Sequence, residues 1–304
     1  GERVVVSGSD PIIGWRYSLE QQANMAGAIR IIETFLDWQP AAVFLNGLPI
    51  RAISGPHPRQ PGEYVWISQG NGGRLLLGLA PELKFDVLNI EGARRTGGFS
   101  ARNVSHVTLR GLEFARIAGT GIEFINGGQN SVVNCVVHDC VLDPDRKAAF
   151  GILFGGQTGS VMRGCLSMRN SYGISISGST DCLIEENASG LHAVDALLVS
   201  WRSRGIRVRR NYIFDNWDSR HPDGFQTYRD VRDLTLDSNV FLNVGQGWQC
   251  QETQNGVIAN NIWAGIHWQN AISCSLRHSA MGVTNLNLRF TNNTFFGGNV
   301  LTGG

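Results

Sequence analysis

The sequence predicts an all-β solenoid, a chain that winds into stacked coils, and three observations support this prediction. Similar segments recur every 22 to 32 residues from about residue 101 onward, and such a period is typical of solenoids. The 304 residues include 38 glycines and only 17% charged residues, which suits turn-rich β structure better than helices. Each repeat also contains short runs in which apolar and polar residues alternate, as in strands with one buried face.

The first strand of each repeat ends at one recurring polar position. In residues 206–211, 234–239 and 288–293, two apolar residues precede an asparagine. Because stacked asparagines at a turn can hydrogen-bond from coil to coil, this column predicts an asparagine ladder. Its members, spaced by 31, 22, 24, 28, 22 and 32 residues, are Asn134, Cys165, Asn187, Asn211, Asn239, Asn261 and Asn293.

A second strand follows in each repeat and begins at a small residue. These residues are Gly121, Gly151, Gly173, Ala196, Gly224 and Gly247. The second and fourth residues of each strand are mostly apolar, so they should point inward, and the third and fifth should point outward. Functional groups of a solenoid must come from outward residues, which stack into rows along one face.

Residues 1–100 lack the repeat, and we assign them to an N-terminal cap and lead-in, continuous with the solenoid of residues 101–304. Ser18 can cap a helix over about residues 18–36, in which apolar residues recur at helical spacing from Met25 to Leu36. Such a helix could cap one end of the stack. Short strands are expected at residues 3–8, 42–47, 64–67 and 75–77.

Composition argues against several partners. The net charge is +1, from 26 basic and 25 acidic residues, which gives no global field for nucleic acid or an anionic membrane. No apolar run is long enough to span a membrane. The six cysteines form no CxxC pair, so we expect buried apolar residues rather than a zinc site or a disulfide framework.

Several short strands per coil, an inward apolar stack and an asparagine column together resemble the right-handed, single-stranded parallel β-helix of the pectin-lyase-like superfamily. The resemblance covers about residues 100–300. It implies a carbohydrate-active enzyme of the polysaccharide lyase or polygalacturonase-like glycoside hydrolase type. It also implies a polysaccharide substrate and a secreted, periplasmic or cell-surface location.

Two carboxylates stand on neighbouring coils, each directly before a second strand. Asp195 and Asp223 align without a gap, and adjacent strands lie about 4.7–4.9 Å apart, so the pair can share a proton or hold a cation. The stretch 222–226 resembles the strand start of the polygalacturonases, whose aspartate before glycine is catalytic, and this implies a general-acid role for Asp223. The next coil departs from that pattern, with Gln246-Gly247-Trp248 in place of paired aspartates.

We expect cleavage of an acidic, uronate-containing polysaccharide by β-elimination. Arginines concentrate at residues 202–210 and 229–232, which favours an anionic polymer. In this interpretation Asp195 and Asp223 are ligands of Ca²⁺, a hard cation that takes oxygen donors, and the proton passes through a basic residue. The candidate catalytic residues are Asp223, Asp195, Tyr228, Arg229 and His221, and the candidate substrate-binding residues are Gln226, Gln249, Gln251, Arg202 and Trp201.

Three alternatives remain open. A glycoside hydrolase would use Asp195 and Asp223 as its acid–base pair, although an inverting enzyme needs carboxyl groups roughly 6.5–9.5 Å apart. A non-catalytic, tailspike-like solenoid would only bind polysaccharide, and an epimerase would share proton abstraction with the lyases. Polar residues also suit bends, so each candidate has a purely structural interpretation. The sequence also allows a homo-oligomer in which another subunit covers the last coil.

Overall fold

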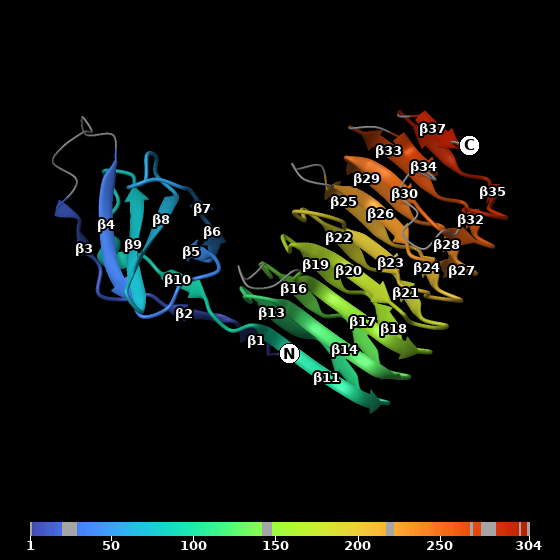
Figure 1. Cartoon of the computed structure of the whole chain (residues 1–304), viewed down its shortest axis with the longest axis horizontal. Helices are drawn as coiled ribbons and strands as arrows, with labels where there is room; N and C mark the ends of the chain where they lie inside the picture. The colour runs from blue at the N-terminus through green and yellow to red at the C-terminus, as the bar shows by residue number, and fades with distance from the viewer. Residues whose placement is uncertain are drawn as a thin grey trace.

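The computed structural model describes residues 2–19, 29–141, 148–216, 222–267, 270–274, 284–297 and 299–302. From Gly97 onward the chain winds into stacked coils whose strands form three long parallel sheets (Figure 1). The predicted all-β parallel solenoid is therefore confirmed. The described residues hold no helix with the length and apolarity that a membrane crossing would take.

The three sheets each take one strand from almost every coil. Sheet 1 contains β1 (Val4–Ser7), β13 (Leu112–Ala115), β16 (Val136–His138), β19 (Leu166–Met168), β22 (Ala188–Gly190), β25 (Tyr212–Asn216), β29 (Val240–Val244), β33 (Ile262–Ile266) and β36 (Thr294–Phe296). Sheet 2 contains β11 (Gly97–Ser105), β14 (Thr120–Gly128), β17 (Phe150–Thr158), β20 (Tyr172–Ser177), β23 (Leu197–Ser200), β26 (Asp223–Tyr228), β30 (Gln246–Cys250), β34 (Asn270–Cys274) and β37 (Asn299–Thr302). Sheet 3 contains β12 (Thr108–Arg110), β15 (Ser131–Val133), β18 (Val161–Arg163), β21 (Leu183–Glu185), β24 (Arg207–Arg209), β28 (Thr235–Asp237), β32 (Val257–Ala259) and β35 (Arg289–Thr291). A short pair, β27 (Val231–Arg232) and β31 (Thr253–Gln254), extends the later coils.

The inward columns lie where the alternation predicts them. One column of sheet 2 runs through side chains that are in parallel register on successive coils and almost fully buried. Its members are Ile122, Ile152, Ile174, Leu197, Phe225 and Trp248. All six cysteines are buried, as expected. Burial of this continuous apolar stack is the main stabilising term of a solenoid, because one coil alone has no enclosed core.

The asparagine ladder is confirmed from Asn187 to Asn293. The Asn211 side-chain Oδ1 accepts the backbone N–H of Asn187 at 3.0 Å, and Asn239 does the same for Asn211 at 2.9 Å. The assignment of Asn134 to this column is wrong by one residue. The register pairs Val133 with Arg163, so Cys135 occupies the position beside Cys165, while Asn134 adopts a left-handed turn conformation with φ 53°.

The predicted helix over residues 18–36 is wrong for its second half, because β4 (Arg30–Leu36) is a strand. Residues 20–28 lie outside the described part of the chain. Ile31, Ile32 and Thr34 are β-branched and favour a strand, and β4 pairs antiparallel with β9 (Gly72–Leu79) along its whole length. The apolar positions that looked helical therefore fill the two faces of a sheet.

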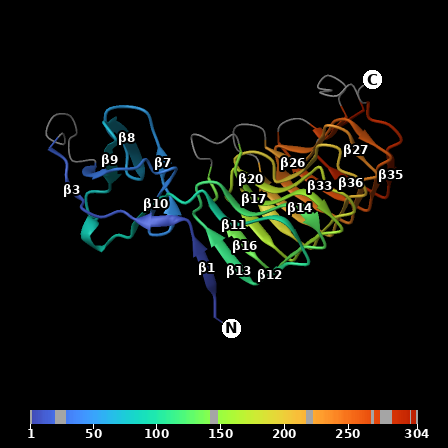
Figure 2. The same ribbon diagram turned by 60° about the horizontal axis from the view of Figure 1, so that its bottom comes forward.

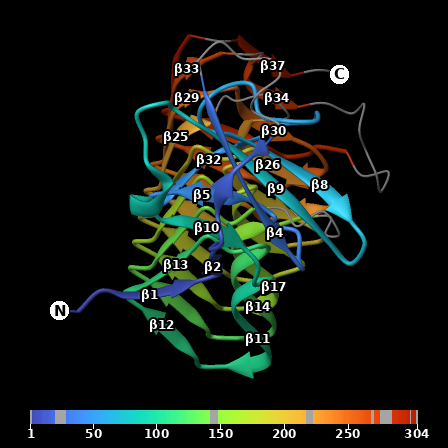
Figure 3. The same cartoon turned by 90° about the vertical axis from the view of Figure 1, so that its left-hand side faces the viewer.

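The lead-in forms two small sheets with a core of their own. One contains β3 (Arg16–Tyr17), β4, β9, β8 (Glu63–Gln69) and β7 (Arg51–Ala52), and the other contains β2 (Ser9–Pro11), β10 (Ile90–Ala93), β5 (Val43–Leu45) and β6 (Leu48–Pro49). They lie beside the first coils (Figure 2) and in front of the solenoid when viewed from that side (Figure 3). Between β9 and β10 lies a short 3₁₀ helix, Phe85–Val87.

Candidate functional site

The outward face of sheet 2 begins with a row of residues at the corner where sheet 1 turns into sheet 2. A Cβ added at Gly173 would meet Ser189 and His192, and one at Gly224 would meet Phe241 and Val244. Ala196, at the corresponding position of the coil between them, is fully buried in the same core. Because these small residues face the interior, the residue before each of them faces outward. We call this the acid row, and its members are Thr120, Phe150, Tyr172, Asp195, Asp223 and Gln246.

Asp195 and Asp223 lie next to each other in the acid row. The Ala196 N–H donates to the Asp223 carbonyl oxygen at 3.0 Å, which fixes the two strands in register. Both aspartates are only 2% exposed. Two carboxylates buried on adjacent strands are an arrangement seen at catalytic and cation-binding sites.

Tyr172 is a neighbour of Asp195 that we did not select from the sequence. Burial raises the pKa of the Tyr172 hydroxyl, and the charges of Asp195 and Tyr228 raise it further. The hydroxyl therefore stays protonated and can donate a hydrogen bond. Its ring also packs on Phe150, with centroids 5.1 Å apart, so an aromatic pair adjoins the two carboxylates.

The other predicted residues of this face are in the expected register. Gln226 lies beside Gln249, and Tyr228 lies beside Ser200. The Gln246 side chain donates to the Gln249 Oε1, which confirms that both side chains share the outer face. Gln249 and Gln251 are buried, whereas Gln226 and Tyr228 are partly exposed.

An aromatic and cationic platform ends this face on the later coils. The Arg229 guanidinium lies 3.8 Å from the centre of the Trp201 ring and 5.1 Å from that of Tyr228. Trp201 is 49% exposed, and Arg202 follows it at the surface, its N–H donating to the Arg229 carbonyl oxygen at 2.7 Å. We call Trp201, Arg202, Tyr228 and Arg229 the platform. His221 lies outside the described residues.

Most of the clustered arginines do not face this site. Arg209 belongs to β24 in sheet 3 and, with Arg163 and Arg210, forms ion pairs with Glu185. Burial opposes ionisation of Glu185, but hydrogen bonds from Arg209 and Arg163 lower its pKa overall. The concentration of positive charge seen in the sequence is thus divided between two faces, and on sheet 3 Arg209 and Arg210 are held in ion pairs with Glu185.

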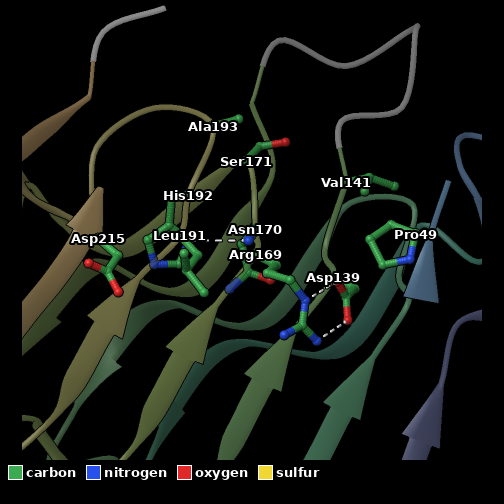
Figure 4. Close-up of a pocket in the computed structure, with 10 residues that line it drawn as sticks. All are labelled: Pro49, Asp139, Val141, Arg169, Asn170, Ser171, Leu191, His192, Ala193 and Asp215. Carbon is green, nitrogen blue, oxygen red and sulfur yellow. Dashed lines mark hydrogen bonds and ion pairs between the residues drawn. The ribbon is translucent and has the colours of Figure 1, made fainter. Parts of the chain in front are cut away.

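A pocket lies at the corner between sheets 1 and 2, next to the acid row (Figure 4). Its volume is about 480 Å³. Arg169 forms a two-pronged ion pair with Asp139, with N–O distances of 2.9 and 2.8 Å. Pro49 of β6 contributes to the wall, so the pocket lies partly between the lead-in and the solenoid. We call it the corner pocket.

A buried histidine stands behind Asp139. His138 contacts the Asp139 Oδ2 through Nδ1 at 2.5 Å and the Glu113 Oε1 through Nε2 at 3.0 Å. Burial opposes protonation of His138, but the two carboxylates raise its pKa above the usual value. Arg3 pairs with Glu113 on the other side, so this network ties the segment before β1 to the solenoid.

The calcium prediction stays a prediction. Within the described ranges, no group of three His, Cys, Asp or Glu side chains is arranged to hold a metal ion. Asp195 and Asp223 supply two carboxylates, and calcium takes six to eight oxygen ligands. Gln226 lies on the strand of Asp223, and Gln249 lies beside it on the next strand, β30, so these two amides are further candidate oxygen donors.

Stacked coils, inward columns and an outward polar face define the class of this chain as a parallel β-helix protein. Residues 80–189 match the family model described as the right handed beta helix region, so the right-handed parallel β-helix that the resemblance implied is confirmed as the fold. No curated protein matches the chain in sequence.

Several solved structures share this architecture at low identity. XylC in complex with xylose is 14% identical with a TM-score of 0.60, over 96% of this chain and 64% of that one. The catalytic unit of a GH87 α-1,3-glucanase from Streptomyces thermodiastaticus strain HF3-3 is 12% identical with a TM-score of 0.51, over 89% and 65%. A protein described as a glycoside hydrolase is 10% identical with a TM-score of 0.56, over 96% and 83%. This chain thus spans less than two thirds of the first two proteins, and the likeness is one of fold.

Proposed function

We propose that this chain is a carbohydrate-active enzyme that hydrolyses glycosidic bonds of a polysaccharide at Asp195 and Asp223. The observation that carries the proposal is the burial of these two carboxylates side by side on an outward row. They are the only charged residues among the six of the acid row. Charged side chains are seldom buried at a protein surface without a functional or structural partner.

The spacing of the two carboxylates favours a retaining mechanism. Adjacent strands are about 4.7–4.9 Å apart, close to the roughly 5–5.5 Å between the carboxyl groups of retaining glycosidases. Two carboxyl groups this close share a proton. The protonated one would donate to the leaving glycosidic oxygen while the other attacks the anomeric carbon. Water would then cleave the glycosyl ester, with the first residue acting as base.

Neighbouring residues have roles that fit this chemistry. Tyr172 keeps its proton and can donate a hydrogen bond to the attacking carboxylate of Asp195. Gln226 and Gln249 present amides that suit sugar hydroxyls. The exposed ring of Trp201 suits the apolar face of a pyranose. The known structures with this fold include proteins named for xylose, glucan and glycoside hydrolysis, which supports a carbohydrate substrate.

The test is a screen of neutral and uronate-containing polysaccharides with the parent chain and with Asp195→Asn and Asp223→Asn variants. Reducing ends and the ultraviolet absorbance of unsaturated products are measured together. We expect reducing ends without that absorbance, and loss of turnover in both variants. Asp233→Asn, at an exposed turn between β27 and β28, is the matched control. Binding without turnover in the parent would reject the enzyme proposal in favour of a polysaccharide-binding solenoid.

β-Elimination is the second candidate, and the platform is the observation that favours it. The Arg229 guanidinium lies near the rings of both Trp201 and Tyr228, where it could neutralise a uronate carboxylate while Tyr228 accepts the adjacent proton. Asp195 and Asp223 would then hold Ca²⁺. Products that absorb in the ultraviolet, together with loss of activity in a chelator, would establish this mechanism and exclude hydrolysis.

A further inference from the structure

The corner pocket opens within two residues of the acid row. Ser171 directly precedes Tyr172, and Ala193 precedes Asp195 by two positions, and both residues line the pocket. The volume of about 480 Å³ falls within the roughly 300–1,000 Å³ of small-molecule sites. A polysaccharide bound over Asp195 would therefore lie next to this pocket, and a neighbouring sugar residue could enter it.

The wall of the corner pocket is apolar, and its base is fixed. Leu191, Val141 and Pro49 present aliphatic surface (Figure 4). His192 is fully enclosed, and burial lowers its pKa to about 3, so it is neutral. Its Nδ1 accepts the Asn170 N–H at 3.2 Å and its Nε2 lies 3.0 Å from the Ser189 hydroxyl. The base of the pocket thus contributes shape and no charge.

The charges that line the corner pocket leave a surplus carboxylate. Asp139 and Arg169 form an ion pair and largely cancel. Asp215 lies across Leu191 from that pair (Figure 4) and accepts an N–H from the Asn243 side chain at 2.5 Å. A carboxylate offers about four acceptor sites, so one amide leaves Asp215 with capacity to accept hydroxyl groups.

We infer that the corner pocket binds a neutral pyranose residue of the substrate and discriminates against uronates, an inference that rests on the hydrolysis proposed above. The aliphatic wall suits the C–H face of a sugar ring. Asp215 suits its hydroxyl groups, because hydrogen bonds to an ionised acceptor are the stronger kind. A uronate carboxylate placed there would meet the like charge of Asp215. The pocket therefore makes neutral polysaccharides the substrate class.

Binding of four monosaccharides to the intact chain tests the inference. D-Xylose and D-glucose are compared with D-glucuronate and D-galacturonate by calorimetric titration at low ionic strength. We expect the neutral sugars to bind at least tenfold more tightly. Asp215→Asn should weaken neutral sugars about tenfold, which is ~1.4 kcal/mol, and should reduce the discrimination. Leu191→Asn should also weaken them while tolerating the left-handed φ of 60° at this position.

Asp233→Asn is the matched control. Asp215 and Asp233 both have a left-handed φ, 47° and 55°. Like Asp215, Asp233 accepts an asparagine side-chain N–H from the next coil, at 3.2 Å from Asn255. The Asp233→Asn variant should bind all four sugars as the parent does. Uronates that bind as tightly as neutral sugars, or an Asp215→Asn variant that behaves like the control, would overturn the inference.

Failure of this inference can be told apart from failure of the proposed function. If the parent hydrolyses no polysaccharide but shows the predicted sugar preference, the pocket assignment stands and the enzyme proposal falls. If the parent cleaves polysaccharide in an Asp223-dependent way while Asp215→Asn alters neither binding nor KM, the enzyme proposal stands and the pocket assignment falls.

Discussion

Glu185 on sheet 3 and the Asp195–Asp223 pair on sheet 2 are buried carboxylates in neighbouring coils, but their surroundings differ. Glu185 receives Arg163, Arg209 and Arg210 from the coils around it. Asp195 and Asp223 lie next to each other in the acid row, between Tyr172 and Gln246. A carboxylate matched by cations serves the fold, whereas two carboxylates set side by side are suited to proton transfer. The same residue type thus serves two purposes on two faces of one solenoid.

The largest expected effect is the loss of activity in the aspartate variants, which distinguishes the catalytic role of Asp195 and Asp223 from the structural role of Glu185. Asp195→Asn and Asp223→Asn should each lower kcat by about 10²–10⁴-fold, the usual contribution of an acid or base. Their thermal stability should change less than that of Glu185→Gln, because asparagine keeps the size and shape of aspartate and the other carboxyl group of the pair remains. Steady-state kinetics and calorimetry on the same samples measure both quantities.

Glu185→Gln should show the opposite pattern. It leaves Arg163 and Arg209 without their charged acceptor, at a cost of about 1–3 kcal/mol in the free energy of unfolding, while kcat stays at the parent value. Denaturant unfolding measures the first quantity. An Asp223→Asn variant that is destabilised as much as Glu185→Gln but fully active would remove the distinction between the two sites.

Tyr172→Phe should lower kcat by about 10–100-fold. The side chain keeps its packing against Phe150, so stability should change little, and only the hydroxyl donor near Asp195 is lost. Tyr64→Phe is a suitable control, because Tyr64 is more deeply buried than Tyr172 and lies in the core of the lead-in, away from the acid row. A pH–rate profile adds a second readout, since loss of a donor to a carboxylate should move the acidic limb to higher pH.

The sequence was enough to predict the solenoid columns, because each inward residue is marked by local alternation in its own coil. The registers from Ile122 to Trp248 and the pairing of Asp195 with Asp223 follow from that local signal. The slip at Asn134 arose where two adjacent residues, Asn134 and Cys135, both suit a turn column. Only the pairing of neighbouring coils decides between them.

Features that depend on distant contacts could not be predicted. The strand Arg30–Leu36 is decided by pairing with β9, about 40 residues further along the chain. Tyr172 directly precedes Gly173, so its place in the acid row can be read from the sequence. Its electrostatic interaction with Tyr228 cannot, because it depends on side chains that reach across two coils. The clustered arginines lie on two different faces because Arg209 belongs to sheet 3, beside Glu185. The number of residues between Glu185 and Arg209 in the sequence does not reveal this contact.

The His138 network contrasts with both acid sites and gives a pH prediction. The pKa of His138 is raised in the folded chain, despite the nearby cation of Arg169, whose Nη2 lies 3.5 Å from Nδ1. Protonated His138 therefore stabilises the folded chain fully at a pH below about 6.5, the pKa of histidine in the unfolded chain. This contribution to the free energy of unfolding is lost as the pH rises through the pKa of His138 in the folded chain. Tm should fall over this range by roughly 2 °C more in the parent than in His138→Gln. Equal pH slopes for the two proteins would contradict this.

Trp201→Ala should have the smallest effect and should change binding alone. Half of the side chain is exposed, so stability should change by less than about 0.5 kcal/mol. Loss of the ring should raise KM about 5–10-fold with kcat nearly unchanged, as expected when an interaction is equally strong in the ground and transition states. Leu242→Ala, an exposed apolar residue of sheet 1 that is 39% accessible, controls for removal of surface area. If the two variants have the same KM, the platform does not contact the substrate, and recognition must be confined to the acid row and the corner pocket.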